Sequence, residues 1–279
     1  ANVSPRAACD IAKREKPKEP PVIKSDLPES HSREYLPFSI SKPGVWGIIS
    51  DIHLPYHDLQ TIELFVGECR RRKVAGVLLN GDILDSHEIS RHDRDPSALR
   101  YVEEVEQGKQ LLAWLRKQLP QAEIFYKLGN HEERLDSYIM GRAPALFGLE
   151  GVNIKSLLHL DDFGIEIVDG KRIVHVGKLH ILHGHELRGG ASSPVNPARG
   201  LYMKARSVAI CGHHHQTSEH HTRNIAMKSE AAWSMGCACD LHPAYMPINQ
   251  WNLGFAFVEV DQQGGFMVEN KRVLNGKIV

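Results

Sequence analysis

The first half of the chain contains three apolar runs, at residues 45–50, 74–79 and 124–128, in which hydrophobic residues are continuous rather than alternating with polar ones. Continuous runs of this length are typical of strands that are covered on both faces. Residues 59–73 and 96–118 repeat their apolar positions at helical spacing. The pattern predicts a strand–helix–strand–helix–strand series, and the crossover helices predict that the three strands are parallel.

The second half predicts a different arrangement, because its apolar runs are short and separated by turn residues. A helix is expected at residues 196–206, where Pro197 suits the first turn. Asp169-Gly170 and Gly177-Lys178 are both expected to form hairpin turns. Strands are expected at residues 165–168, 173–176, 179–182, 207–211, 216–222, 231–235, 254–260 and 266–273. The whole chain therefore predicts an α/β fold in which two mixed sheets form a sandwich with helices outside.

Residues 1–43 differ from the rest of the chain in composition. Residues 13–28 alternate charged residues with proline, and such a segment cannot bury enough apolar surface to offset the entropy lost on ordering. We expect an extended arm or linker at residues 1–43, through which the chain could form a homo-oligomer, and one domain at residues 44–279.

The overall composition narrows the choice of partners. Lys+Arg and Asp+Glu both number 34, so the net charge gives no support for a long nucleic-acid track, although nucleic acid stays open as a substrate. The five cysteines have irregular spacing and are expected to be reduced, buried thiols, which favours a cytoplasmic protein. No apolar stretch reaches the ~20 residues that span a bilayer, so no membrane association is expected.

Five short polar clusters carry the chemistry, and each follows an apolar run. Such clusters converge when parallel strands lie side by side, because ligands collect at the carboxyl ends of strands. Oxygen and nitrogen donors of this kind suit Mn, Fe, Zn or Ni. The clusters are Asp51-Ile-His53, Gly81-Asp82-Ile-Leu-Asp85, Gly129-Asn130-His131-Glu132, His183-Gly-His185 and Gly212-His213-His214-His215. Together they predict a two-metal site for phosphoryl transfer.

This set of motifs resembles the calcineurin-like metallophosphoesterase superfamily, and residues 233–247 are similar to its phage-type members. The resemblance implies a four-layer sandwich, with two mixed sheets flanked by helices, and a centre of two divalent cations, with Mn expected first and Fe, Zn or Ni as alternatives. It implies that Asp82 bridges both ions and that His131 serves the leaving group, oriented by Asp85. The implied ligands are Asp51, His53, Asp82 and His215 for one ion, and Asp82, Asn130, His183 and His213 for the other.

The resemblance implies hydrolysis of a phosphoester by a metal-bridging hydroxide, with three alternatives for the use of the fold. A phosphodiesterase is preferred, because protein phosphatases of this superfamily grip the phosphate dianion with an arginine where this chain has Ser86. A phosphomonoesterase or protein phosphatase is the second alternative, and a non-catalytic scaffold is the third. Four arginines are candidates to bind the phosphate in place of that arginine, namely Arg91, Arg94, Arg142 and Arg188.

Overall fold

The computed structural model describes residues 28–187 and 195–279, and most of the expected arm and the candidate Arg188 lie outside these ranges. Within them, seven strands form the larger sheet in the order β13-β12-β11-β2-β3-β4-β5. Its parallel part consists of β2 (Gly44–Ile49), β3 (Gly76–Asn80), β4 (Glu123–Lys127) and β5 (Ile165–Val168). The antiparallel part consists of β11 (Gly254–Val260), β12 (Phe266–Leu274) and β13 (Lys277–Ile278).

The smaller sheet has the order β1-β6-β7-β8-β10-β9 in the described part of the chain. It combines parallel pairs, such as β7 with β8, with antiparallel pairs, such as β6 with β7. Its strands are β1 (Phe38–Ile40), β6 (Val174–Val176), β7 (Leu179–Leu182), β8 (Ala209–Cys211), β9 (Ser218–Arg223) and β10 (Ser229–Ser234).

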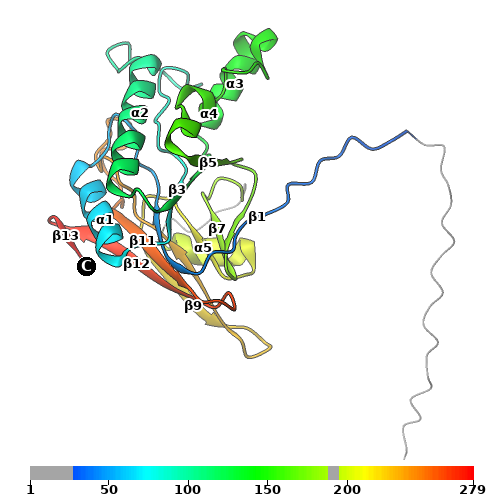
Figure 1. Cartoon of the computed structure of the whole chain (residues 1–279), viewed down its shortest axis with the longest axis vertical. Helices are drawn as coiled ribbons and strands as arrows, with labels where there is room; N and C mark the ends of the chain where they lie inside the picture. Colours follow the sequence, from blue (N-terminus) through cyan, green and yellow to red (C-terminus); the bar gives the residue numbers. More distant parts are fainter. Residues whose placement is uncertain (1–27, 188–194) are drawn as a thin grey trace, which may run out of the picture. The chain divides into compact units, whose positions relative to one another are not determined.

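Helices cover the outer face of each sheet (Figure 1). The helix α1 (Leu59–Arg72) begins after Asp58, whose carboxylate accepts from the backbone N–H of Thr61. It packs with α2 (Tyr101–Gln118) on the larger sheet, whereas α5 (Pro197–Ala205) packs on the smaller one. The remaining helical segments are α3 (Glu133–Arg142), α4 (Ile154–Leu157), and the 3₁₀ turns η1 (Pro144–Leu146) and η2 (Leu160–Phe163).

Three hydrophobic layers separate these four layers of structure. Ile48 and Leu78 point between the two sheets, whereas their chain neighbours Ile49 and Leu79 point toward α1 and α2. Successive side chains of a strand face opposite sides, so a continuous apolar run is needed where both sides are buried. The expected four-layer sandwich is confirmed. The apolar runs are continuous because these strands are buried on both faces, as the sequence indicated.

Some expectations for individual elements were wrong. Asp169-Gly170 does not close a hairpin, because β5 pairs with β4 in the larger sheet and β6 belongs to the smaller one. The chain crosses between sheets at this turn, where Gly170 O accepts from the buried ammonium of Lys127. The helix expected from residue 96 begins at Tyr101, whose N–H donates to Glu88 Oε2.

Candidate metal centre

All five polar clusters lie just beyond strand ends. Asp51 follows β2, Asp82 follows β3 and Asn130 follows β4, so the parallel part of the larger sheet places them at one edge. His183 and His213 follow β7 and β8, which are parallel neighbours in the smaller sheet. The fold thus brings together side chains that are up to 164 positions apart in the sequence, from Asp51 to His215.

The backbone at these positions is unusual. Asp51, His53, Asp82, His213 and His215 all have positive φ angles, between 49° and 66°. Residues other than glycine rarely adopt this left-handed conformation, and it persists only where the surrounding structure enforces it. Its concentration in five candidate ligands indicates a functional site rather than ordinary turns.

The carboxylate of Asp82 lies at the middle of the cluster. Its Oδ2 is 3.1 Å from His183 Nε2 and 3.9 Å from His53 Nε2. Its Oδ1 accepts from the backbone N–H of His131 at 2.9 Å. Gly129 leaves the space that this carboxylate occupies, because a Cβ at Gly129 would lie 2.2 Å from Oδ1. Asp82 thus lies within 4 Å of an imidazole from each sheet.

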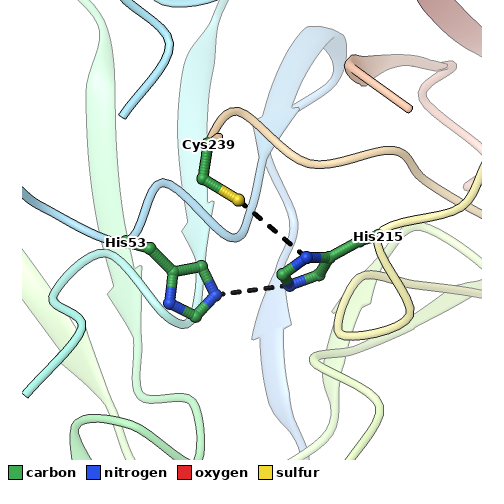
Figure 2. A group of neighbouring side chains, drawn as sticks. All are labelled: His53, His215 and Cys239. Atoms are coloured by element: carbon green, nitrogen blue, oxygen red, sulfur yellow. Dashed lines mark hydrogen bonds between the residues drawn. The ribbon is translucent and has the colours of Figure 1, made fainter. Parts of the chain in front are cut away.

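On one side of Asp82, donor atoms of three residues meet. Asp51 Oδ1 is 3.2 Å from His215 Nε2, and His215 Nε2 is 3.3 Å from His53 Nε2. Figure 2 shows nitrogen atoms of these two imidazoles facing each other, with the sulfur of Cys239 directed at the other ring nitrogen of His215. Asp51 itself is fully buried and accepts from Ser50 Oγ and the His213 N–H. These oxygen and nitrogen atoms match the donor set that a divalent transition metal prefers.

On the other side of Asp82, His183 is held in a defined orientation. Its Nδ1 lies 2.8 Å from the carbonyl oxygen of Asn80, so Nδ1–H donates there and Nε2 is the ring nitrogen that faces Asp82. That Nε2 lies 3.2 Å from Asn130 Oδ1, and the ligand atoms of Asp82, His183 and His213 lie within 4.8 Å of one another. His185 points elsewhere and pairs with Glu133 at 3.5 Å, so His183 is the histidine of this motif that reaches Asp82.

The electrostatics of the cluster favour cations. Burial opposes protonation of His183 and His215, yet the carboxylates of Asp82 and Asp51 raise the pKa of each imidazole to about 10. Burial also opposes ionisation of Asp82, but His183 and His131 hold its pKa well below the usual range. Buried carboxylates that raise histidine pKa values this far create a negative potential, which a divalent cation can neutralise.

His131 lies beside the cluster, next to Asp85 and Arg134. Its Nδ1 is 2.7 Å from the carbonyl oxygen of Asp85 and 3.3 Å from Asp85 Oδ1. The Asp85 carboxylate makes its shorter contact with His53 Nδ1, at 2.9 Å, so Asp85 holds both histidines. Arg134 Nη2 lies 2.9 Å from His131 Nε2, and Arg134 Nη1 donates to Asp85 O at 2.7 Å.

Arg134 is a residue that the sequence motifs did not single out. It lies on the first turn of α3, and His131 lies in the turn that leads into this helix, where its carbonyl oxygen accepts from the Arg134 N–H. Among the arginines that were singled out, Arg91 lines the same cavity as His131, and Arg94 and Arg142 are exposed. The signal that could have found Arg134 is its nearness in sequence to His131, at the start of the helix that follows this motif.

Two carboxylates outside the expected ligand set, the buried Glu132 and the half-buried Glu186, support the loops. Glu132 accepts from the backbone N–H groups of Asp82, Ile83, Leu84 and Gly129, and from the hydroxyl of Tyr126. Glu186 accepts from the N–H groups of His183 and Gly184 and pairs with the buried Lys127 at 2.9 Å. Because Lys127 belongs to the larger sheet, this ion pair joins the two sheets behind the centre.

A comparison with known protein families shows which family the chain belongs to. Residues 47–228 match the model of the calcineurin-like phosphoesterases. The chain belongs to this family. The chain is also similar to the gene 54 protein of Mycobacterium phage D29, with 28% identity over 228 residues that cover 77% of this chain and 88% of the phage protein.

Solved structures with a similar arrangement share little sequence. The phosphoesterase Yfce from E. coli has 14% identity and a TM-score of 0.35, with 81% of this chain and 98% of that chain covered. A dimetal phosphatase from Danio rerio has 12% identity and a TM-score of 0.36, with 78% and 93% covered. Vacuolar protein sorting 29 from Cryptosporidium parvum has 14% identity and a TM-score of 0.45, with 85% and 95% covered.

The remaining expectations concern cysteines and membranes. Cys69, Cys211, Cys237 and Cys239 are buried, reduced thiols, as expected, while Cys9 lies outside the described residues. Among the helices that the structure describes, none combines the length and the apolar character needed to cross a bilayer.

Proposed function

We propose that this phosphoesterase hydrolyses phosphodiesters with two divalent cations, of which manganese is the first candidate. The observation that carries the proposal is the position of Asp82 Oδ2, between His183 Nε2 at 3.1 Å and His53 Nε2 at 3.9 Å. Two groups of donor atoms that share Asp82 are each compact enough for one ion, namely Asp51 with His53 and Asp82, and Asp82 with His183 and His213. His215 completes the first set and Asn130 the second.

The cations would supply positive charge against the phosphate oxygens and lower the pKa of a water molecule. The protein side of the reaction is a proton transfer by His131. Its Nδ1 is fixed by Asp85 O, so its Nε2 is the atom available to the leaving oxygen. Burial lowers the pKa of His131, but the carboxylates of Asp82 and Asp85 outweigh burial and raise it. His131 is therefore suited to hold a proton near neutral pH.

The preference for diesters rests on the position that follows Asp85. Ser86 is fully buried, and its N–H donates to Glu104 Oε1, so this position offers no cation to a phosphate dianion. A monoester dianion carries one more negative charge than a diester and benefits from a bidentate arginine.

A second candidate function, a phosphomonoesterase, is favoured by Arg134. This guanidinium lies 2.9 Å from His131 Nε2 and is only partly buried. Protonation of His131 at Nε2 would end this hydrogen bond, because both groups would then be donors, and Arg134 would be released toward a bound phosphate. Arg134 could thus bind a phosphate dianion in place of the arginine that is absent at the position of Ser86.

The two candidates are separated by one comparison of substrates. We would measure kcat/KM for bis-p-nitrophenyl phosphate and for p-nitrophenyl phosphate with the same metal, corrected for their uncatalysed rates. A diesterase should prefer the first substrate in wild type and in Arg134→Ala. If wild type prefers the monoester and Arg134→Ala loses that preference, the monoesterase proposal replaces ours.

The matched control is Arg142→Ala, which removes an exposed arginine from the other end of the same helix. It should leave both rates unchanged. If neither substrate is turned over in the presence of metal, the fold serves as a non-catalytic scaffold and both enzymatic proposals fail.

A further inference from the structure

A continuous groove passes over the candidate metal centre. A cavity of about 310 Å³ lies beside His53 and His215, and it shares Asp85, His87 and Tyr245 with a second cavity of about 670 Å³. The second cavity includes His131 and Arg134 in its lining. The combined space is larger than a phosphate group needs, so part of it is available to the organic part of a substrate.

The end of the groove beside His53 and His215, which we call the aromatic pocket, is lined by Tyr56, Tyr245 and Trp251. Trp251 packs on His215 with ring centroids 4.2 Å apart, and Tyr245 meets Trp251 at 6.2 Å. Tyr245 nevertheless remains 74% exposed and Tyr56 45% exposed. Packing in the protein core therefore does not account for these two aromatic rings beside a polar site.

The two ends of the groove differ in charge, because arginines lie at one end only, where Asp93 accompanies them, and the other end has carboxylates without a lysine or arginine. The carboxylates of Asp95 and Asp240 line the aromatic pocket. Asp240 is held in place because its N–H donates to Tyr56 O and its Oδ1 accepts from the N–H of His242. The opposite end is lined by Arg91 and Arg134, which belong to both the second cavity and a third one of about 250 Å³.

We propose that the aromatic pocket binds the single nucleoside of a nucleotide phosphodiester, with its base against Tyr245 and Trp251. The inference rests on the proposed function and names its substrate class. The phosphate would lie at the metal centre next to Arg134, and the hydroxyl or amino donors of the nucleoside would reach Asp95 or Asp240. Aromatic rings stack on every base, while carboxylates select groups that donate hydrogen bonds.

The charges argue against two other occupants. A nucleic-acid strand that continued through the pocket would place further phosphates beside Asp95 and Asp240, which repel them. A purely apolar ester group would offer neither carboxylate a hydrogen-bond donor beyond those that Ser97 and His242 already supply. A nucleoside matches the aromatic rings and the carboxylates at the same time.

The first test compares two substrates that release the same p-nitrophenol. One is thymidine 5′-(p-nitrophenyl phosphate), and the other is methyl p-nitrophenyl phosphate. The nucleoside should raise kcat/KM by about tenfold or more, which is within the range of one stacked base. Tyr245→Ala should bring the ratio of the two values close to one, and Tyr245→Phe should keep it. Phe147→Ala is the matched control, because Phe147 is 50% exposed and lines none of these three cavities.

Equal kcat/KM values for the two substrates in wild type would overturn the proposal. An equal loss for both substrates in Tyr245→Ala would also overturn it, because it would mean that the nitrophenyl ring occupies the aromatic pocket. In either case the phosphodiesterase function itself would stand.

The second test addresses the carboxylates. Adding a 3′-phosphate to the thymidine substrate should lower kcat/KM in wild type, and the double variant Asp95→Asn, Asp240→Asn should lose most of this discrimination. A preference of wild type for the extra phosphate would favour a nucleic-acid strand and overturn the single-nucleoside proposal.

A binding measurement separates failure of the proposed function from failure of the nucleoside site. If no ester is hydrolysed, titration calorimetry with thymidine 5′-phosphate still reports the pocket in the metal-loaded protein. Binding that weakens in Tyr245→Ala and persists in Phe147→Ala would support the nucleoside site without catalysis. Binding that Tyr245→Ala leaves unchanged would overturn it.

Discussion

The sulfur atom of Cys239 lies 3.9 Å from Nδ1 of His215 (Figure 2). The other ring nitrogen, Nε2, faces Asp51 at 3.2 Å. When Nδ1–H donates to the sulfur, Nε2 keeps its lone pair for a cation. Cys239 therefore has a position from which it can set the tautomer of a candidate ligand, although it lies 24 positions further along the chain.

We expect Cys239→Ala to weaken metal binding. Loss of a group that orients a ligating histidine typically costs about 10- to 100-fold in affinity. Cys239→Ser should recover part of the loss, because its hydroxyl can also accept from Nδ1–H. Competition with a chromophoric chelator measures the affinity. Cys69→Ala is the control, because this buried thiol lies in the core under α1. Equal affinities for Cys239→Ala and wild type would contradict the role.

Asp82→Ala should abolish the binding of both cations. Asp82 is the carboxylate that the two donor groups share, so each ion would lose an anionic ligand. Elemental analysis of the purified variant gives the number of ions per chain. The control is Asp161→Ala, because the side chain of Asp161 is 76% exposed. Retention of two ions in Asp82→Ala would rule out the bridging role.

His131→Ala should keep its metal content and lose most of its turnover. His131 contacts Asp85 and Arg134, and neither cation needs it as a ligand. Loss of a general acid typically costs about 10²–10⁴-fold in rate. The loss should grow as the leaving group becomes more basic, because such groups need the proton most. A series of aryl esters measures this trend, and an equal loss across the series would argue against an acid role.

Stability should depend on pH through Glu104. Burial, with smaller contributions from Asp85 and Glu132, raises the pKa of Glu104 from its ordinary value of 4.5 to about 8, against the hydrogen bond from Ser86. Between these two values the folded chain holds a proton that the unfolded chain releases, so this group makes the protein less stable as pH rises. Above pH 8 the contribution no longer changes.

Glu104→Gln should remove this dependence. The free energy of unfolding of the variant, relative to wild type, should rise between pH 5 and pH 8 by at most about 1.4 kcal/mol per pH unit. Urea unfolding in the presence of a chelator measures it. Glu106→Gln is the control on the same helix, because the side chain of Glu106 is 58% exposed. A constant difference between Glu104→Gln and wild type across this range would contradict the prediction.

The expected arm at residues 1–43, homo-oligomer formation and the cytoplasmic location stay predictions. Within the described residues, Phe38–Ile40 forms an edge strand that pairs with Val174–Val176. This short strand escaped notice because three residues carry too little periodicity to stand out beside a proline-rich segment.

The sequence by itself determined the layers of the fold and the candidate residues of the proposed centre. Val77, Leu78 and Leu79 are all apolar because the strand is buried on both faces, and this requirement is visible without any structure. The candidate ligands were equally visible, because each pair or triplet is contiguous and follows such a run. Strand burial and the placement of ligands directly after a strand are requirements on neighbouring residues, so both are visible in the order of residues along the chain.

Tertiary structure alone decided which other side chains join the site. Glu186 joins the His183 loop to Lys127 of the other sheet, and Cys239 and Tyr245 reach the centre from a segment far from the other motifs. It also decided that β5 and β6 belong to different sheets, although a turn sequence separates them. These relationships depend on contacts between segments distant in the chain, and the identity of one residue does not encode its partner. They become defined only when burial and hydrogen bonding must be satisfied for all segments at once.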